Sequence, residues 1–452
     1  MCGVLGIVNN DNIFTQMYEG LTYLQHRGQD SAGIATENLC VKNKGLVKNV
    51  FNNESCEVLF DNNAIGHVRY STTGSQTMTN IQPCIHESEK CRISMCHNGN
   101  INNMKELINL AEIDENTTDS EYLNMYLSEK INGLQTITCE AIFDIILDTM
   151  KVLQGSYCVL LLIKNFGTIC FRDINGIRPL CYGAKHDSYI ISSESVVLDI
   201  LDYQFIRDVH PGEIIIFEKE QMPRFTQYKS TYLRPCLFEY IYFARIDSVI
   251  DNISVYEARY KMGILLGEKI QKMNLSIDTI IPVPDSGLIF ALGVSEVLQI
   301  KIEYGFVKNN YIDRTFIMEN NKIIQKSVKR KINALKQIMK NKKILIVDDS
   351  IVRGNTSSHL IYLAKNAGAE NTYIASGSPK ILYPNNYGIY IPCKEKLIAN
   401  KRTNKEIADV LGTEKVIYND LQDVINILKN MNNRISDFEI SMFHDGHFNH
   451  YS

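Results

Sequence analysis

The chain has 452 residues, which is too long for one ordinary hydrophobic core and predicts two or three domains. Hydrophobic residues make up 45% of it, and its formal net charge of −4 gives no reason to expect nucleic acid or a membrane surface as a partner. No apolar run is long enough to cross a bilayer, and the N-terminus lacks the features of a signal peptide.

Twelve cysteines are spread along the chain, and none of them forms a CxxC pair. Most lie in apolar stretches, where a free cysteine acts as a small hydrophobic residue. Without a secretion signal, this pattern predicts reduced thiols and a cytoplasmic protein.

Residues 2–230 contain short alternating or apolar runs separated by Gly and Asn turns, which predict strands. Two helical patterns interrupt them, near residues 12–25 and 119–131. Together these elements predict an α+β domain with packed sheets.

Cys2 follows the initiator methionine directly, so removal of Met1 would make it the N-terminal residue. The α-amine of such a residue has a pKa of about 8, close to that of the thiol, and can accept the thiol proton. This is the logic of N-terminal nucleophile hydrolases. A cysteine at position two is weak evidence by itself, because most such residues have no catalytic role.

Four motifs strengthen this interpretation: LQHRGQDSAGI (24–34), GHVRYSTTG (66–74), HNGNI (97–101) and TDSEYL (118–123). Arg69 can hold the α-carboxylate of glutamine, and Asp119 its α-ammonium. Asn98 and the Gly99 N–H can form an oxyanion hole. Taken singly, Arg69 could instead form a surface ion pair, and Asn98–Gly99 a hairpin turn.

Residues 231–254 are aromatic and apolar, which predicts a packed connector. From residue 255 onward, helical patterns alternate with short strands near 279–282, 302–308, 344–347 and 371–376. This alternation predicts a parallel, doubly wound sheet, whose ligands bind at the carboxyl ends of the strands. Two segments stand at such ends: VPDSG (283–287) and VDDSIVRGN (347–355).

Residues 344–358 carry the most specific pattern. A short apolar strand leads to Asp348 and Asp349, then to a loop of small residues and a helix from about Thr356. The loop and the helix N-terminus form a phosphate cradle, while the two acids face sugar hydroxyls and a divalent cation. The pattern resembles the phosphoribosyl pyrophosphate (PRPP) signature of type I phosphoribosyltransferases. The alternative is a strand-to-helix turn capped by acids.

Residues 322–343 carry nine Lys or Arg residues and no acid. The segment could be a solvated loop, or a basic flap that closes on a polyphosphate. The candidate flap residues are Arg314, Lys326, Lys329 and Arg330.

Over nearly its whole length, the chain resembles the glutamine phosphoribosylpyrophosphate amidotransferases. The motifs named above carry the resemblance, together with RDINGIRPL (172–180), SSES (192–195) and GFVKNNYIDRTFI (305–317). It implies an α+β N-terminal-nucleophile glutaminase domain (residues 2–230) with stacked sheets between helices. An α/β type I phosphoribosyltransferase domain with a parallel sheet (231–452) follows.

The resemblance also implies residue roles. Cys2 is the nucleophile, with Asn98 and Gly99 as catalytic partners, and Arg69, Thr72 and Asp119 bind glutamine. PRPP is bound by Asp348, Asp349, Ser350, Gly354, Asn355, Thr356 and Ser357. One Mg²⁺ ion per subunit lies at Asp348, Asp349 and position 287, and ammonia passes between the sites through an internal channel.

Two departures from the family pattern qualify these roles. Some members hold a [4Fe–4S] cluster on four cysteines, but only Cys236 stands at such a position here, and YPNNYGI (383–389) lacks the expected cysteine. We therefore expect no Fe–S cluster. Gly287 stands where relatives often place a serine associated with the metal, so one Mg²⁺ contact could come from Ser286 or water instead.

The expected activity is glutamine-dependent conversion of PRPP to 5-phosphoribosylamine, glutamate and pyrophosphate, the first step of purine nucleotide synthesis. The alternatives are a glutaminase coupled to another acceptor and a PRPP-binding regulator. Purine nucleotides are expected as feedback inhibitors, and a homo-oligomer, dimer or tetramer, as the assembly.

Overall fold

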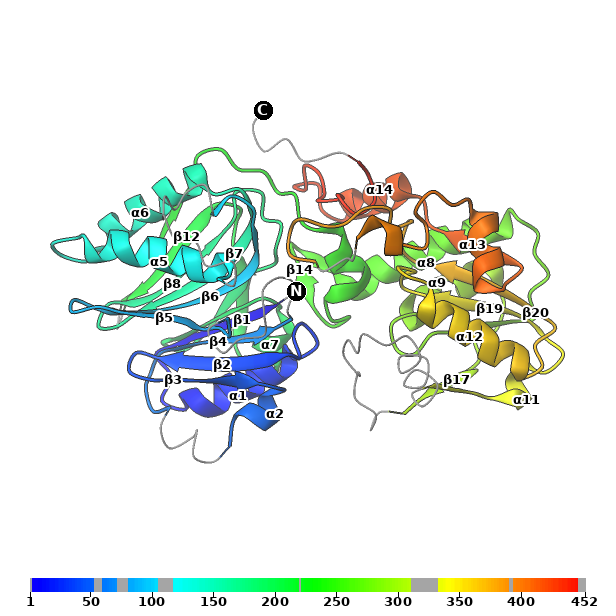
Figure 1. Cartoon of the computed structure of the whole chain (residues 1–452), viewed down its shortest axis with the longest axis horizontal. Coiled ribbons are helices and arrows are strands. Elements are labelled where there is room, and N and C mark those ends of the chain that lie inside the picture. The colour runs from blue at the N-terminus through cyan, green and yellow to red at the C-terminus, as the bar shows by residue number, and fades with distance from the viewer. Residues whose placement is uncertain are drawn as a thin grey trace.

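The structure is a computed structural model that describes residues 2–52, 59–70, 80–104, 117–218, 221–309, 332–389 and 393–445. Two units lie side by side along its longest axis (Figure 1). The first unit contains two antiparallel sheets, and the second contains a parallel sheet wrapped by helices. Both predicted fold classes are therefore confirmed.

The first unit is built on a seven-stranded and a six-stranded antiparallel sheet. In spatial order the seven strands are β11 (Gln204–Asp208), β9 (Cys181–Lys185), β10 (Ser188–Ser192), β1 (Gly3–Val8), β4 (Ala64–Arg69), β2 (Ser31–Thr36) and β3 (Cys40–Lys44). The six are β13 (Arg224–Gln227), β12 (Glu213–Glu218), β8 (Gly167–Arg172), β7 (Gly155–Ile163), β6 (Arg92–Ile101) and β5 (Cys84–Glu87).

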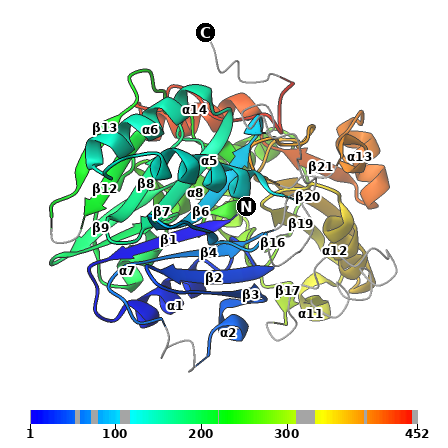
Figure 2. The ribbon, with the colours of Figure 1, turned by 60° about the vertical axis from the view of Figure 1, so that its left-hand side comes forward.

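The two sheets are stacked between helices (Figure 2). The outer face of the seven-stranded sheet packs on α1 (Ile13–Tyr23), α2 (Val47–Val50) and α7 (Val196–Ile200), and that of the six-stranded sheet on α5 (Asp119–Asn132) and α6 (Cys139–Val152). The sequence of β7 is almost entirely apolar and does not alternate with polar residues. Leu161 faces the helices and Leu160 faces the other sheet, so both faces of the strand are buried.

The second unit is a four-stranded parallel sheet in the order β16 (Thr279–Pro282), β19 (Lys343–Asp348), β20 (Asn371–Ser376) and β21 (Lys415–Tyr418). Two apolar clusters cover its faces. The helices of this unit are α8 (Val255–Gln271), α9 (Leu288–Leu298), α11 (Lys336–Met339), α12 (Asn355–Asn366), the 3-10 turn η2 (Lys394–Lys396), α13 (Asn404–Leu411) and α14 (Leu421–Met431). No helix among the described residues is long and apolar enough to span a membrane.

One predicted strand of this sheet was wrong. Residues 302–308 contribute only an isolated parallel bridge between Ile302 and Ile280. The rest of the segment forms β17 (Phe306–Lys308), which pairs antiparallel with β18 (Ile332–Ala334) as a separate ribbon. A Cβ on Gly305 would lie 2.6 Å from Ile281 Cδ1, so the chain runs close against β16 before β17 begins.

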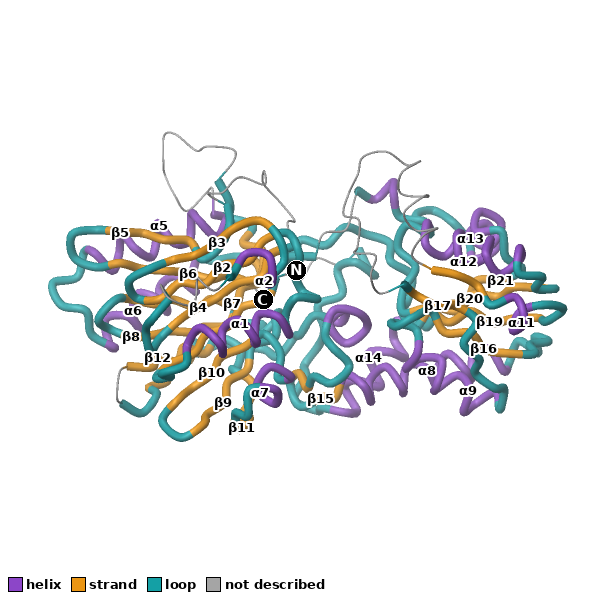
Figure 3. The backbone as a smooth tube through the Cα atoms, turned by 90° about the horizontal axis from the view of Figure 1, so that it is seen from below, coloured by secondary structure: helices purple, strands orange, loops and turns teal. Residues whose placement is uncertain are grey.

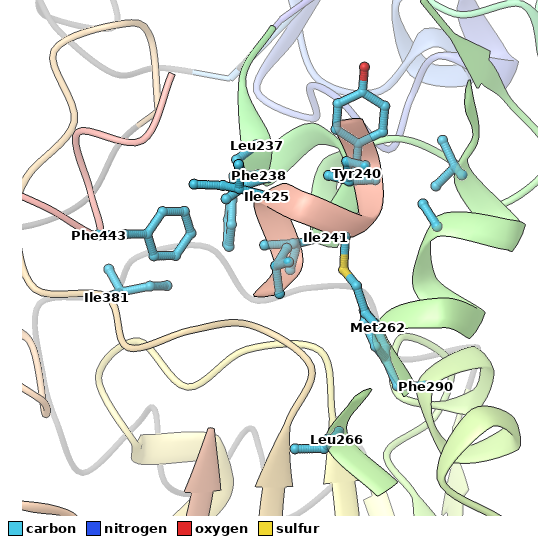
Figure 4. Packing of buried hydrophobic residues seen from close by; sticks show 14 of the residues in the cluster. Leu237, Phe238, Tyr240, Ile241, Met262, Leu266, Phe290, Ile381, Ile425 and Phe443 are labelled. Atoms are coloured by element: carbon cyan, nitrogen blue, oxygen red, sulfur yellow. The ribbon is translucent and has the colours of Figure 1, made fainter. Parts of the chain in front are cut away.

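The connector between the units is packed, as predicted. It contains a π-helical turn, η1 (Glu239–Phe243), and a short hairpin of β14 (Val249–Ile250) and β15 (Ile253–Ser254). Its apolar side chains, among them Tyr240 and Ile241, lie in one buried cluster with Met262 and Phe290 of the second unit (Figure 4). The tube in Figure 3 shows this segment between the two sheet systems.

Candidate active sites

Cys2 lies at the start of β1, in the middle of the seven-stranded sheet. Its backbone nitrogen donates a 3.2 Å hydrogen bond to Asn98 Oδ1, and its Sγ lies 3.9 Å from the Tyr70 carbonyl oxygen. Gly3 pairs with Val68 on β4, so the antiparallel register places Arg69 opposite Cys2. Arg69 and Asn98, which are far apart in sequence, thus both lie beside Cys2.

Asn98 and Gly99 lie inside the long strand β6, so the alternative that they form a hairpin turn is wrong. Because Asn98 Oδ1 already accepts from Cys2, its Nδ2 group remains as a donor. That Nδ2 is buried and has no hydrogen-bond partner among the described residues. Such a donor beside the nucleophile suits a developing oxyanion.

Arg69 and Asp119 border the same site. Arg69 is only 6% exposed, so a surface ion pair does not describe it. Asp119 begins α5, and its Oδ2 accepts from the Ile101 backbone nitrogen at 3.0 Å, at the end of the strand that carries Asn98. Thr72, the third predicted glutamine-binding residue, lies outside the described residues.

Sequence reasoning missed His97. Its Nδ1 lies 2.9 Å from Ser120 Oγ and 3.8 Å from Asp119 Oδ2. Burial lowers the pKa of His97, while Asp119 and then Cys2 act in the opposite direction. The effect of burial is larger, and it favours the neutral imidazole. The residue opens the HNGNI motif, so the motif marked it although no role was assigned to it.

Sequence reasoning also missed Arg27, the arginine of LQHRGQD. Its side chain is fully buried, and its Nε donates to the Cys2 carbonyl oxygen at 3.0 Å. Its other nitrogens bind Glu194 and Glu239. Arg27 therefore connects the backbone of Cys2 to the connector between the two units.

The second candidate site lies at the carboxyl end of β19. Asp348 is the last residue of the strand and Asp349 follows it, and each is 5% exposed. Asp348 Oδ1 accepts from the Asp349 backbone nitrogen at 2.9 Å and from Ser286 Oγ at 3.4 Å. Burial, and then the neighbouring Asp349, raise the pKa of Asp348 well above its ordinary value.

The loop after these acids leads into α12, which begins at Asn355, one residue before the predicted start. Gly354 has φ of +80°, a conformation that favours glycine, and immediately precedes the helix. Ser350 Oγ donates to Asp349 Oδ2 at 2.5 Å, and Ser357 is buried in the first turn of the helix beyond Thr356. The predicted strand, loop and helix N-terminus are thus all present.

A divalent cation fits the two acids. Burial and then the adjacent carboxylate of Asp349 raise the pKa of Asp348, and a bound cation would offset both effects. Among the described residues no group of three or more His, Cys, Asp or Glu is arranged to hold a metal.

Position 287 cannot contribute a side chain to that cation in this backbone. A Cβ on Gly287 would lie 2.1 Å from the Val347 carbonyl oxygen and 2.9 Å from the Val283 nitrogen. Ser286, by contrast, reaches Asp348. The predicted flap residues Arg314, Lys326, Lys329 and Arg330 lie outside the described residues.

Arg259 of α8 stands between this site and the connector. Its Nε donates to the Tyr240 carbonyl at 2.9 Å and its NH2 to that of Ala244 at 2.7 Å. Burial lowers the pKa of Arg259 to about 10, although the charge of Asp349 acts in the opposite direction. Arg259 thus binds the Tyr240 and Ala244 carbonyls at η1, and the charge of Asp349 in the second site acts on its guanidinium.

Comparisons with known proteins agree with both sites. Residues 67–199 match the model of a glutamine amidotransferase domain, and residues 257–376 match that of a phosphoribosyl transferase domain. The amidophosphoribosyltransferase of Escherichia coli is 42% identical over 463 residues, which cover 98% of this chain and 92% of that protein. That of Saccharomyces cerevisiae is 38% identical and covers 98% of this chain and 91% of its own length.

A solved structure of glutamine PRPP amidotransferase from B. subtilis, complexed with ADP and GMP, superposes with a TM-score of 0.87. It is 31% identical and covers 99% of this chain and 97% of its own. Fold and sites therefore define a glutamine amidotransferase fused to a phosphoribosyltransferase. The chain belongs to the amidophosphoribosyltransferase family.

This membership confirms the activity predicted from the motifs. The enzyme converts PRPP and glutamine to 5-phosphoribosylamine, glutamate and pyrophosphate, the first step of purine nucleotide biosynthesis. The presence of both domain types in one chain argues against the two alternatives, a glutaminase coupled to another acceptor and a PRPP-binding regulator.

Proposed function

We propose that Cys2 is the nucleophile of the glutaminase reaction. Once Met1 is removed, the neutral α-amine takes the thiol proton, and the thiolate attacks the side-chain carbonyl carbon of glutamine. The tetrahedral intermediate expels ammonia, which leaves with that proton, and water then hydrolyses the thioester to glutamate. The observation that carries this proposal is the position of Cys2 beside Asn98, whose Nδ2 has no hydrogen-bond partner in the part of the chain that the structure describes.

The remaining glutaminase residues hold the substrate. Asn98 Nδ2 and the Gly99 N–H stabilise the oxyanion. Arg69 binds the α-carboxylate and Asp119 the α-ammonium, with Thr72 as a further glutamine-binding residue. The burial of Arg69 supports its role, because a partly desolvated guanidinium binds a carboxylate more strongly than an exposed one.

PRPP binds at the carboxyl end of β19. Asp348 and Asp349 accept hydrogen bonds from the ribose hydroxyls, while the loop and helix N-terminus bind the 5′-phosphate through Ser350, Gly354, Asn355, Thr356 and Ser357. One Mg²⁺ ion per subunit would be held by the two acids and would neutralise the departing pyrophosphate. We expect no Fe–S cluster, which iron analysis of the purified protein tests.

Substitution of Cys2 by Ala tests the proposal. We expect glutamine-dependent phosphoribosylamine formation to be abolished or nearly abolished, while ammonia-dependent formation continues, since the two half-reactions use separate residues. Cys40→Ala is the matched control, because Cys40 is likewise only partly buried but lies on the edge strand β3. Loss of both activities in a folded Cys2→Ala protein would contradict the assignment.

Several features of the whole enzyme belong to the same proposal. The domain boundary falls near residue 230, before the connector. The enzyme is cytoplasmic and a homo-oligomer, dimer or tetramer. Purine nucleotides inhibit it, which the ADP and GMP bound to the B. subtilis relative support. Sedimentation and inhibition assays with those two nucleotides test these points.

A further inference from the structure

Residues 385–389, here called the docking loop, extend from the transferase unit to the glutaminase unit. The Asn386 carbonyl oxygen accepts from Asn100 Nδ2 at 2.9 Å. The Tyr387 carbonyl oxygen accepts from Ser156 Oγ at 2.8 Å. Asn100 and Ser156 are paired neighbours on β6 and β7, so two backbone carbonyls of the docking loop bind one position of the sheet.

The docking loop also touches the oxyanion residue. A Cβ on Gly388 would lie 2.9 Å from the Gly99 carbonyl carbon and oxygen, so only a glycine allows this close approach. A Cβ on Gly99 would in turn meet the Ser156 carbonyl oxygen at 2.0 Å. Gly99 is therefore enclosed between β7 and the docking loop, and a displaced loop would no longer enclose it.

Asn385 holds the docking loop in shape. Its Oδ1 accepts from the backbone nitrogens of Tyr387 at 2.8 Å and Ile389 at 3.2 Å. Its Nδ2 donates to Glu439 Oε2 and Ser441 Oγ, both at 3.1 Å. The amide thus makes two accepted and two donated bonds, which is the full capacity of an asparagine side chain.

Glu439, which accepts a hydrogen bond from Asn385, is itself held in place. Glu439 is 1% exposed, and its Oε1 accepts from the Ser441 backbone nitrogen at 2.8 Å. Its main chain bonds to the connector, from Leu237 N to Glu439 O at 3.1 Å and from Glu439 N to Pro235 O at 3.0 Å. The docking loop is therefore tied to the body of the transferase unit.

We propose that Asn385 is a positioning residue for the glutaminase reaction, because it holds the docking loop against Gly99 and the β6–β7 pair. The inference rests on the proposed roles of Cys2, Asn98 and Gly99. Under those assignments Arg69 and Asp119 bind glutamine in the ground state, whereas the oxyanion residue beside the docking loop acts on the transition state. Loss of the Asn385 hydrogen bonds that hold the docking loop should therefore lower kcat and leave the KM for glutamine nearly unchanged.

The first test compares two neighbouring asparagines. Asn385→Ala should lower kcat for glutamine-dependent synthesis by about tenfold or more, as small misplacements of catalytic groups do. Its KM for glutamine and its ammonia-dependent rate should remain near those of the parent. Asn386→Ala is the matched control and should change none of these values, because only the backbone carbonyl of Asn386 makes the contact.

The second test exchanges amide and carboxylate. Asn385→Asp keeps the acceptor for the two backbone N–H groups but places a carboxylate against Glu439, so kcat should fall. Adding Glu439→Gln restores an amide–carboxylate pair and should recover most of the lost kcat. This comparison also decides the question if Asn385→Ala fails to fold.

Three results would overturn the inference: an unchanged kcat in Asn385→Ala, an equal loss of glutamine- and ammonia-dependent rates, or no recovery in the exchanged pair. Failure of the underlying function would look different. If Cys2→Ala retained glutamine-dependent synthesis, the nucleophile assignment would be wrong whatever the Asn385 variants do.

Discussion

Arg27 and Glu239 lie 212 positions apart and form a buried ion pair with two contacts, NH2 to Oε1 at 2.7 Å and NH1 to Oε2 at 3.1 Å. Arg27 belongs to the glutaminase unit and Glu239 to the connector. The same guanidinium donates to the Cys2 carbonyl. The π-helical turn η1, which carries Glu239, is also held by Arg259 through the Tyr240 and Ala244 carbonyls.

The first prediction concerns this ion pair. Arg27→Met removes the charge but keeps much of the volume. Glu194 and Glu239 stay buried and lose their bonds to Arg27, although Glu194 keeps its contact with His26 and Glu239 its contact with Arg178. We expect the free energy of unfolding to fall by about 3–5 kcal/mol, as for other broken buried ion pairs. Chemical denaturation measures it. Arg224→Met is the control, because its partner Glu140 is exposed, and exposed ion pairs add little to stability.

The second prediction concerns the PRPP acids. Asp348→Asn and Asp349→Asn should each reduce ammonia-dependent and glutamine-dependent synthesis together. In each variant the ribose hydroxyls lose a hydrogen-bond acceptor and the cation loses a ligand where the C1–pyrophosphate bond breaks. Steady-state kinetics with both nitrogen donors measure this effect. Asp409→Asn, on the exposed face of α13, should leave both rates unchanged. Unchanged PRPP kinetics in either acid variant would remove that residue from the site.

The third prediction concerns pH. Burial, and then Asp251, raise the pKa of Asp208 to about 7, although Arg172 opposes the shift. Because this value exceeds the ordinary pKa of an aspartate, about 3.9, the folded state binds the proton more tightly. The contribution of Asp208 to stability therefore decreases from pH 4 to pH 7 and is constant above that range.

Asp208→Asn removes this dependence. The urea midpoint of the variant, relative to that of the parent, should be higher at pH 8 than at pH 5. Asp202→Asn is the control, since its side chain is 85% exposed. A constant difference between Asp208→Asn and the parent at both pH values would show that Asp208 does not titrate as described.

The sequence predicted what is local or repeated along the chain. Alternating strands and helices indicated the parallel sheet, and Asp348 and Asp349 after an apolar strand indicated the PRPP site. It could not predict contacts that depend on how the units are docked. Asn100 and Asn386 are 286 positions apart, and neither belongs to a pattern that points to the other. Residues 302–308 were misassigned because a short apolar run does not specify its pairing partner.

The last prediction concerns coupling through the basic segment. A glutaminase that acts without an acceptor wastes glutamine, so PRPP should stimulate glutamate release. We propose that Lys326, Lys329 and Arg330, with Arg314 near the start of the segment, close on PRPP as a flap that excludes water. The variant Lys326→Gln/Lys329→Gln/Arg330→Gln removes three of these charges. In this variant PRPP should stimulate glutamate release less and should protect residues 318–343 from protease less. A triple neutralisation at Lys394, Lys396 and Lys401, also basic but at η2 and beyond, is the matched control. If the flap variant keeps both stimulation and protection, the segment is a solvated loop and the flap hypothesis is wrong.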